Sequence, residues 1–115
     1  MQYLLLIYSN EQAMNALPAE KAAQMTAGYM AYAETLKSAG VMQGCNRLKR
    51  TNAASTVRTA GGKTEVLDGP YAETKEQLAG YFLIDVPNLD EALSWAARCP
   101  GAGYGAIEVR PVWEL

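Results

Sequence analysis

The chain has 115 residues, of which half are apolar and about a fifth are charged, a composition typical of one compact globular domain. Lys and Arg number 10 against 12 for Asp and Glu, a net charge of -2; this balance disfavours nucleic-acid binding, which needs a basic surface. The apolar run at residues 3–8 follows no basic segment and is too short to span a bilayer, so we expect a cytoplasmic protein with no membrane partner.

The chain contains no histidine, which excludes Ser–His and Cys–His nucleophile pairs. Its two cysteines, Cys45 and Cys99, have neither CxxC nor zinc-ligand spacing, so we expect two reduced thiols. A zinc or iron site would have to be built from carboxylates and thiols alone, which is uncommon. We therefore expect no metal and no cofactor.

The N-terminal third predicts a strand followed by a long helix. Residues 3–8 are continuously apolar and of the right length for a buried central strand. A polar segment follows, and a helical pattern then runs from Pro18 to Ala39, with Gly40 as its stop. Its apolar stripe consists of Ala22, Met25, Tyr29, Tyr32, Ala33 and Leu36. We interpret the larger side chains of this helix as core and dimer packing rather than a cofactor site; they are Met25, Tyr29, Met30 and Tyr32.

Short strands are predicted in the middle of the chain, at residues 43–49, 55–59 and 63–67. The pair Gly61-Gly62 separates the last two strands, and both glycines accept positive φ, so a tight hairpin turn is expected there. Asp68-Gly69-Pro70 then interrupts the chain again.

The C-terminal third predicts strand, helix and strand. Residues 80–86 are apolar and rich in aromatic and β-branched residues. Asn88 and Glu91 have capping-box spacing at the start of a helix over residues 89–98, and residues 106–113 alternate as a strand with one polar face. On the helix we expect one apolar side, formed by Leu89, Ala92, Leu93 and Ala96. On the last strand we expect one apolar face, formed by Ile107, Val109, Pro111 and Trp113.

This order predicts an α+β fold: one domain over residues 1–115, a ferredoxin-like βαββαβ unit with an extra β-hairpin. Two helices would cover one face of the sheet. Strand residues such as Leu5, Val57, Val66 and Phe82 indicate that the other face is not fully solvated. Packing of that face against a second copy would give a dimeric α/β barrel, so we expect a homodimer.

Three blocks in the C-terminal two thirds of the chain carry a family resemblance: DGPYAETKEQLA at 68–79, GYFLIDVPNLDEALSWAARCP at 80–100 and IEVRPV at 107–112. In this order they resemble the YCII-related family in its DGPF type, with Tyr71 where the motif usually has Phe. The resemblance implies a ferredoxin-like fold, a dimeric α/β barrel, a bacterial origin and, for some relatives, a link to extracytoplasmic-function sigma factors. The family has no settled activity. A His–Asp pair has been proposed as the active site of YCII-like members, and a chain without histidine does not reproduce it.

The densest group of polar side chains lies between two predicted strands, and consists of Asp68, Tyr71, Glu73, Thr74, Lys75 and Glu76. Its carboxylates could hold a ligand or act as a general base, or they could form an Asx turn and a solvated face. Arg58 and Arg110 project from strands, where each could anchor a ligand carboxylate or take part in ion pairs across the sheet, for instance with Glu108. The predicted ligand-binding residues are Asp68, Tyr71, Glu73, Lys75, Arg58 and Arg110.

Three functions remain open from the sequence. The first is a non-catalytic small-molecule-binding or regulatory domain. The second is a cofactor-free isomerase or lyase with Asp68 or Glu73 as base and Tyr71 or Arg110 as polarising group. The third is an interaction partner in a sigma-factor pathway. A pocket with a buried carboxylate would favour the enzyme, a pocket without one would favour binding, and a filled interior would favour the interaction protein.

Overall fold

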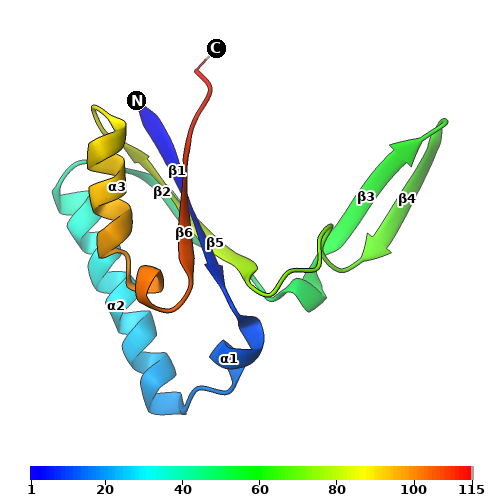
Figure 1. Cartoon of the computed structure of the whole chain (residues 1–115), viewed down its shortest axis with the longest axis horizontal. Coiled ribbons are helices and arrows are strands. Elements are labelled where there is room, and N and C mark those ends of the chain that lie inside the picture. The colour runs from blue at the N-terminus through cyan, green and yellow to red at the C-terminus, as the bar shows by residue number, and fades with distance from the viewer. Residues whose placement is uncertain (115) are drawn as a thin grey trace.

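The computed structural model describes residues 1–114, which form a four-stranded sheet, two main helices on one side of it and a separate hairpin on the other (Figure 1). The strands are β1 (Gln2–Ser9), β2 (Met42–Arg47), β3 (Ser55–Ala60), β4 (Lys63–Asp68), β5 (Gln77–Asp85) and β6 (Ala106–Pro111). The helices are α1 (Glu11–Asn15), α2 (Ala19–Ser38) and α3 (Leu89–Arg98), with 3-10 turns η1 (Thr51–Ala53) and η2 (Pro100–Gly103).

The sheet confirms the ferredoxin-like prediction. Its strand order is β2-β5-β1-β6, and all neighbouring strands are antiparallel. The β1–α2–β2 and β5–α3–β6 segments are its two crossovers, and β3 and β4 form the extra hairpin inserted between them. The α+β fold class derived from the sequence therefore holds for the chain.

The core lies between the sheet and the two long helices. On β1 the buried residues alternate as Tyr3, Leu5 and Ile7, as expected for a strand with one covered face. Leu5, Leu36 and Ile84 are the largest fully buried side chains, and truncation of any of them to alanine would cost about 2–5 kcal/mol.

Side-chain caps define the starts of two helices. The Glu91 backbone N–H donates to Asn88 Oδ1 over 3.0 Å, which confirms Asn88 as the N-cap of α3. The five-residue helix α1 was not expected from the sequence, which reads there as a polar connection. It begins after Asn10, whose Oδ1 accepts from the Ala13 N–H at 2.9 Å.

One predicted apolar side is only partly buried, and one predicted strand is shorter than expected. On α3 only Ala92 and Ala96 are buried, whereas Leu89 and Leu93 are 45% and 47% exposed, because the helix meets the sheet along its small residues. Trp113 is 86% exposed because β6 ends two residues before it.

The second face of the sheet has different residues from those that the sequence indicated. Leu5 and Phe82 belong to the buried helix side, and Val57 and Val66 lie on the hairpin outside the sheet. The uncovered face instead carries the alternate residues, which are only partly buried. Among them are Leu4, Leu6 and Leu83, with Leu4 directly opposite Leu83.

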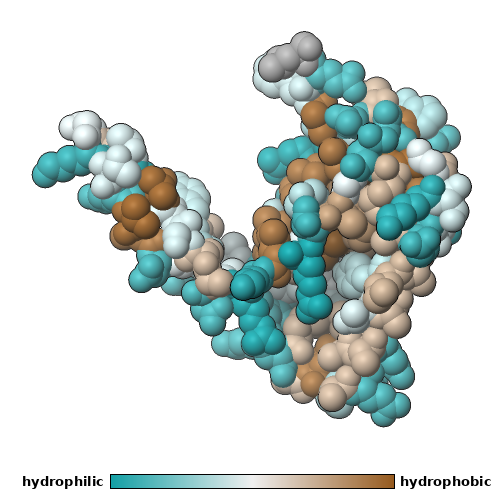
Figure 2. Space-filling model, turned by 180° about the vertical axis from the view of Figure 1, so that it is seen from behind, coloured by the Kyte–Doolittle hydropathy of each residue, from teal (hydrophilic) through white to brown (hydrophobic). Residues whose placement is uncertain are grey.

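The β3–β4 hairpin projects from the body as an arm, defined as residues 55–68 (Figures 1 and 2). Gly61 and Gly62 have φ of 58° and 78°, the paired positive values of a type I′ turn, so the predicted turn is confirmed. Val57, Val66 and Leu67 on this arm are all more than half exposed.

No helix in the part of the chain that the structure describes is long and apolar enough to cross a membrane.

Candidate functional site

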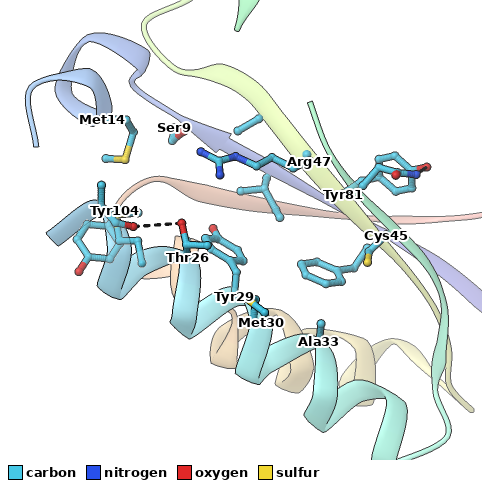
Figure 3. Close-up of a pocket in the computed structure, with 18 of the residues that line it drawn as sticks. Ser9, Met14, Thr26, Tyr29, Met30, Ala33, Cys45, Arg47, Tyr81 and Tyr104 are labelled. Atoms are coloured by element: carbon cyan, nitrogen blue, oxygen red, sulfur yellow. Dashed lines mark hydrogen bonds between the residues drawn. The ribbon is translucent and has the colours of Figure 1, made fainter. Parts of the chain in front are cut away.

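A cavity of about 400 Å³ lies between α2 and the helix side of the sheet (Figure 3). Ligand sites in proteins are typically roughly 300–1,000 Å³ and mostly apolar, and this cavity has that size and character. The helices and the turns beside them contribute Met14, Leu17, Ala22, Met25, Thr26, Tyr29, Met30, Ala33, Gly101 and Tyr104. The strands contribute Ile7, Ser9, Cys45, Asn46, Arg47, Ala79, Gly80, Tyr81 and Phe82.

The cavity exists because α2 packs tightly on the sheet only toward its C-terminal end. Tyr32 and Leu36 are its only buried residues, and the N-terminal half extends beyond the core. There the short side chains of Ala22 and Thr26 line the hollow. The sequence interpretation of this helix as packing holds for Tyr32, whereas Tyr29 and the two methionines beside it line the cavity.

Two glycines keep the cavity open. Gly80 pairs with Ile7 on one side and Arg47 on the other, and a Cβ there would lie 2.7 Å from the Asn46 carbonyl oxygen. A Cβ on Gly101 would overlap the Tyr29 hydroxyl. Any larger residue at either position would displace a wall of the cavity.

Aromatic rings form the inner end of the site. Tyr29 stacks on Phe82 with ring centroids 6.5 Å apart, and Tyr32 meets Phe82 edge-on at 5.2 Å. Burial, reinforced by the neighbouring Cys99 thiol, raises the pKa of both tyrosine hydroxyls well above the ordinary value, and burial also raises the pKa of Cys99. At neutral pH these groups are therefore uncharged hydrogen-bonding groups rather than bases or nucleophiles.

Arg47 is the only charged side chain that lines the cavity within residues 1–114. A bulge in β2 between Met42 and Gly44 shifts the register, so that Arg47 falls on the helix side opposite Gly80. Figure 3 shows its guanidinium extending between sheet and helix toward Ser9. Over the described chain it makes no ion pair and no side-chain hydrogen bond, so its donors are available to a ligand.

Arg47 also begins a basic stretch. With Lys49 and Arg50 it borders a second, open hollow of about 440 Å³. These three residues are among only 10 Lys and Arg in an acidic chain, so they concentrate positive potential at one place. The run Asn46-Arg47-Leu48-Lys49-Arg50 was the signal that sequence reasoning passed over.

Glu11 fixes this basic stretch against α1. Its carboxylate accepts from the Thr51 backbone N–H at 2.8 Å and from Thr51 Oγ1 at 2.7 Å. The Glu11 N–H in turn donates to Gln77 Oε1 at 2.9 Å. The Glu11 carboxylate is thus engaged in holding the chain that follows β2.

The six residues predicted from the sequence lie outside this cavity lining. Arg58 on the arm and Tyr71 in the loop after it are brought together: the guanidinium donates to the Tyr71 hydroxyl at 2.6 Å and lies 4.9 Å from its ring centre. Asp68 ends β4 and is exposed, as are Glu73 and Lys75 in the following loop. In that loop the Thr74 hydroxyl donates to the backbone carbonyl of Glu76.

Arg110 lies on the uncovered face of the sheet and donates through Nε to Glu108 on its own strand at 2.7 Å, an ion pair along the strand rather than across it. No group of three His, Cys, Asp or Glu residues suited to a metal ion occurs among residues 1–114. The role of the six predicted residues in binding stays a prediction.

Comparison with known proteins assigns the chain to a family. It is 40% identical over 114 residues to an uncharacterised protein of Rhizobium meliloti (strain 1021), covering 97% of this chain and 92% of that protein. Its fold is similar to that of 5-chloro-2-hydroxyhydroquinone dehydrochlorinase from Burkholderia phenoliruptrix AC1100, which was solved in complex with 2,5-dihydroxybenzoquinone. The TM-score is 0.56 at 18% sequence identity, and the match covers 99% of this chain and 94% of that one. The profile of the YCII-related domain matches residues 1–115. The chain therefore belongs to the YCII-related family.

Proposed function

We propose that this protein binds a small molecule with an apolar or aromatic body and one anionic group, held in the cavity between α2 and the sheet with its anion on Arg47. The observation that carries the proposal is the Arg47 guanidinium, which lines an apolar cavity and has no protein partner over residues 1–114. A guanidinium stays charged at all physiological pH values and offers a planar pair of donors that matches a carboxylate.

The chemistry of the walls supports binding better than acid–base catalysis. Tyr29 and Phe82 offer ring surfaces, and Met25 and Met30 are flexible apolar groups that adapt to a ligand's shape. The described lining contains no carboxylate and no imidazole. Of the three functions that the sequence left open, a pocket of this kind favours the binding domain.

The test is calorimetric titration of the purified protein with 2-naphthoate and with its neutral isostere 2-naphthamide. We expect 2-naphthoate to bind and the amide to bind at least tenfold more weakly. In the Arg47→Gln variant, 2-naphthoate affinity should fall about 10- to 150-fold, the equivalent of a charged hydrogen-bond pair worth about 1.5–3 kcal/mol. The matched control is Lys63→Gln, which removes one positive charge at the remote turn of the arm. Equal affinities of wild type and Arg47→Gln would refute the proposal.

The proposal includes a homodimer formed through the uncovered sheet face. Leu4 and Leu83 face each other there, and Leu6 lies two residues along β1 on the same face, with the Arg110–Glu108 ion pair beside them on β6. Packing two such faces against each other, one from each chain, would remove these apolar side chains from water.

A second candidate is a lyase, and the specific observation in its favour is the fold of the dehydrochlorinase neighbour. In this reading Arg47 polarises an oxygen of a hydroxylated aromatic substrate. The test incubates the protein with 5-chloro-2-hydroxyhydroquinone under anaerobic conditions and measures chloride release above the rate without protein. Release that is lost in Arg47→Gln but not in Lys63→Gln would support the enzyme, and chloride release at the background rate would exclude this reaction.

A further inference from the structure

We infer that the β3–β4 arm is an interaction surface for a second copy of this chain: each protomer's arm crosses onto its partner and buries Val57 and Val66 there. The inference rests on the homodimer of the proposed function and adds to it a contact outside the sheet.

The chain exposes far more surface than a compact domain of its size. Its accessible surface is 7996 Å², whereas a folded monomer of 12.4 kDa is expected to expose about 6,100 Å². Its radius of gyration is 16.0 Å, against about 13 Å for a compact chain of this length. Roughly 1,900 Å² per chain is thus in excess, and the arm, in which no residue is buried, contributes to it.

The arm has few contacts of its own that would stabilise it. None of the residues in β3 or β4 is buried, and an isolated two-stranded hairpin is at best marginally stable in water. Val57 and Val66 are paired across the two strands and so point to the same face, where they are 60% and 63% exposed. This apolar pair on a regular hairpin is suited to packing against another surface.

A second copy is the occupant that fits these surfaces. The arm leaves the body on the side of the sheet away from the helices (Figure 1). Hydrophobic side chains gather on the arm and on the side of the body nearest to it (Figure 2). A partner sheet stacked on the uncovered face would lie about 10 Å away, on the same side as the arm, and two-fold symmetry would bring the partner's arm across in return.

The area agrees with this occupant. If both copies covered their excess, the dimer would bury roughly 3,800 Å², within the range of about 2,000–5,000 Å² found for obligate homodimers. The sheet face alone would leave the arm exposed in the dimer. Covering the arm as well brings its exposed valines into the interface of the same partner.

The first test measures the dimer dissociation constant by sedimentation velocity. The double variant Val57→Asp/Val66→Lys replaces the apolar pair by an opposite-charge pair, which keeps the cross-strand match so that the hairpin still forms. We expect a rise of at least about 100-fold in the dissociation constant, because four valine side chains lose their burial per dimer. The control is Ala60→Asp, which places a carboxylate opposite Lys63 on the other face of the arm and should change the constant less than threefold.

The second test does not depend on the variant's folding. p-Benzoylphenylalanine at position 59, on the same face as Val57, should photocrosslink two chains, whereas the same group at position 21 on α2 should not. A monomeric wild type would overturn both the dimer and the arm contact. A dimeric wild type whose dissociation constant is unchanged in the Val57/Val66 variant, or which gives no crosslink from position 59, would overturn the arm contact alone. Binding of 2-naphthoate reports on the cavity independently of both results.

Discussion

The contact between Gly101 and Tyr29 provides a quantitative test of how the cavity wall is built. An alanine Cβ at position 101 would overlap the Tyr29 hydroxyl and would also lie 3.2 Å from Ile7 Cγ2 and 3.4 Å from Ile107 Cδ1. The hydroxyl contact requires movement, whereas the two methyl contacts are only tight. Overpacking of this kind costs about 1–3 kcal/mol, and most of that cost should be traceable to a single oxygen atom.

The prediction is a double-mutant cycle. Gly101→Ala should lower the free energy of unfolding by about 2 kcal/mol. Tyr29→Phe should lower it by about 1 kcal/mol, because the hydroxyl loses its polar contacts with the Gly101 backbone and the Cys99 thiol. In the Tyr29→Phe background Gly101→Ala should cost less than about 1 kcal/mol, because the overlapping atom is gone. The coupling energy of at least about 1 kcal/mol lies in the range measured for residues in contact.

The assay is urea unfolding followed by far-ultraviolet circular dichroism. For a slope of about 2 kcal/mol/M, the single variant Gly101→Ala should shift the midpoint by about 1 M. Equal costs of Gly101→Ala in the two backgrounds would refute the reasoning. If Tyr29 instead swings into the cavity to make room, stability is nearly unchanged but 2-naphthoate affinity falls, and that pair of results would equally contradict a fixed wall.

Three further predictions concern stability and thiol chemistry. Burial raises the pKa of Tyr32 above its ordinary value of 10, so its contribution to stability should be fully present below pH 10 and decline as pH rises beyond it, by at most about 1.4 kcal/mol per pH unit. In urea titrations at alkaline pH, the unfolding free energy of Tyr32→Phe should fall less steeply with pH than that of wild type. Asn88→Ala should cost about 1 kcal/mol of unfolding free energy by loss of the α3 cap, and Asn88→Ser should restore most of it. Ellman's reagent should modify the exposed Cys45 rapidly and the buried Cys99 only after unfolding; two equally fast thiols would contradict the position of Cys99 in the core.

The elements that could be predicted from sequence are those fixed by local chemistry. The period of α2, the Asn88 cap and the Gly61-Gly62 turn each depend on residues close together in the chain. Helix α1 could not be predicted because five residues show no period, and its position depends on Glu11 contacting the distant Thr51. The exposure of Leu93 could not be predicted, because the pattern shows which side of a helix is apolar but not how wide a stripe the sheet will cover.

The cavity depends on features that no local pattern shows. Strand alternation alone would place Arg47 and Met42 on opposite faces of β2, but the bulge between Met42 and Gly44 changes the parity. A one-residue change of register moves a side chain from one face of a sheet to the other. Prediction therefore favoured the polar loop around Asp68, whose composition is visible in the sequence, over a single arginine whose importance comes from its position.

Arg47 and the arm share one property: within the single chain, Arg47 has no counter-ion and the valines of the arm have no apolar surface to pack against. The Arg47 side chain is exposed beside the apolar walls and gains no counter-ion from the described residues, so its charge contributes little to the stability of the isolated fold. An exposed pair of valines on a hairpin likewise contributes nothing to the body's core. The chemistry of the two is different, one site calling for an anion and the other for apolar surface, so one ligand does not satisfy both. A small anionic molecule in the cavity and a second chain against the arm satisfy each in turn.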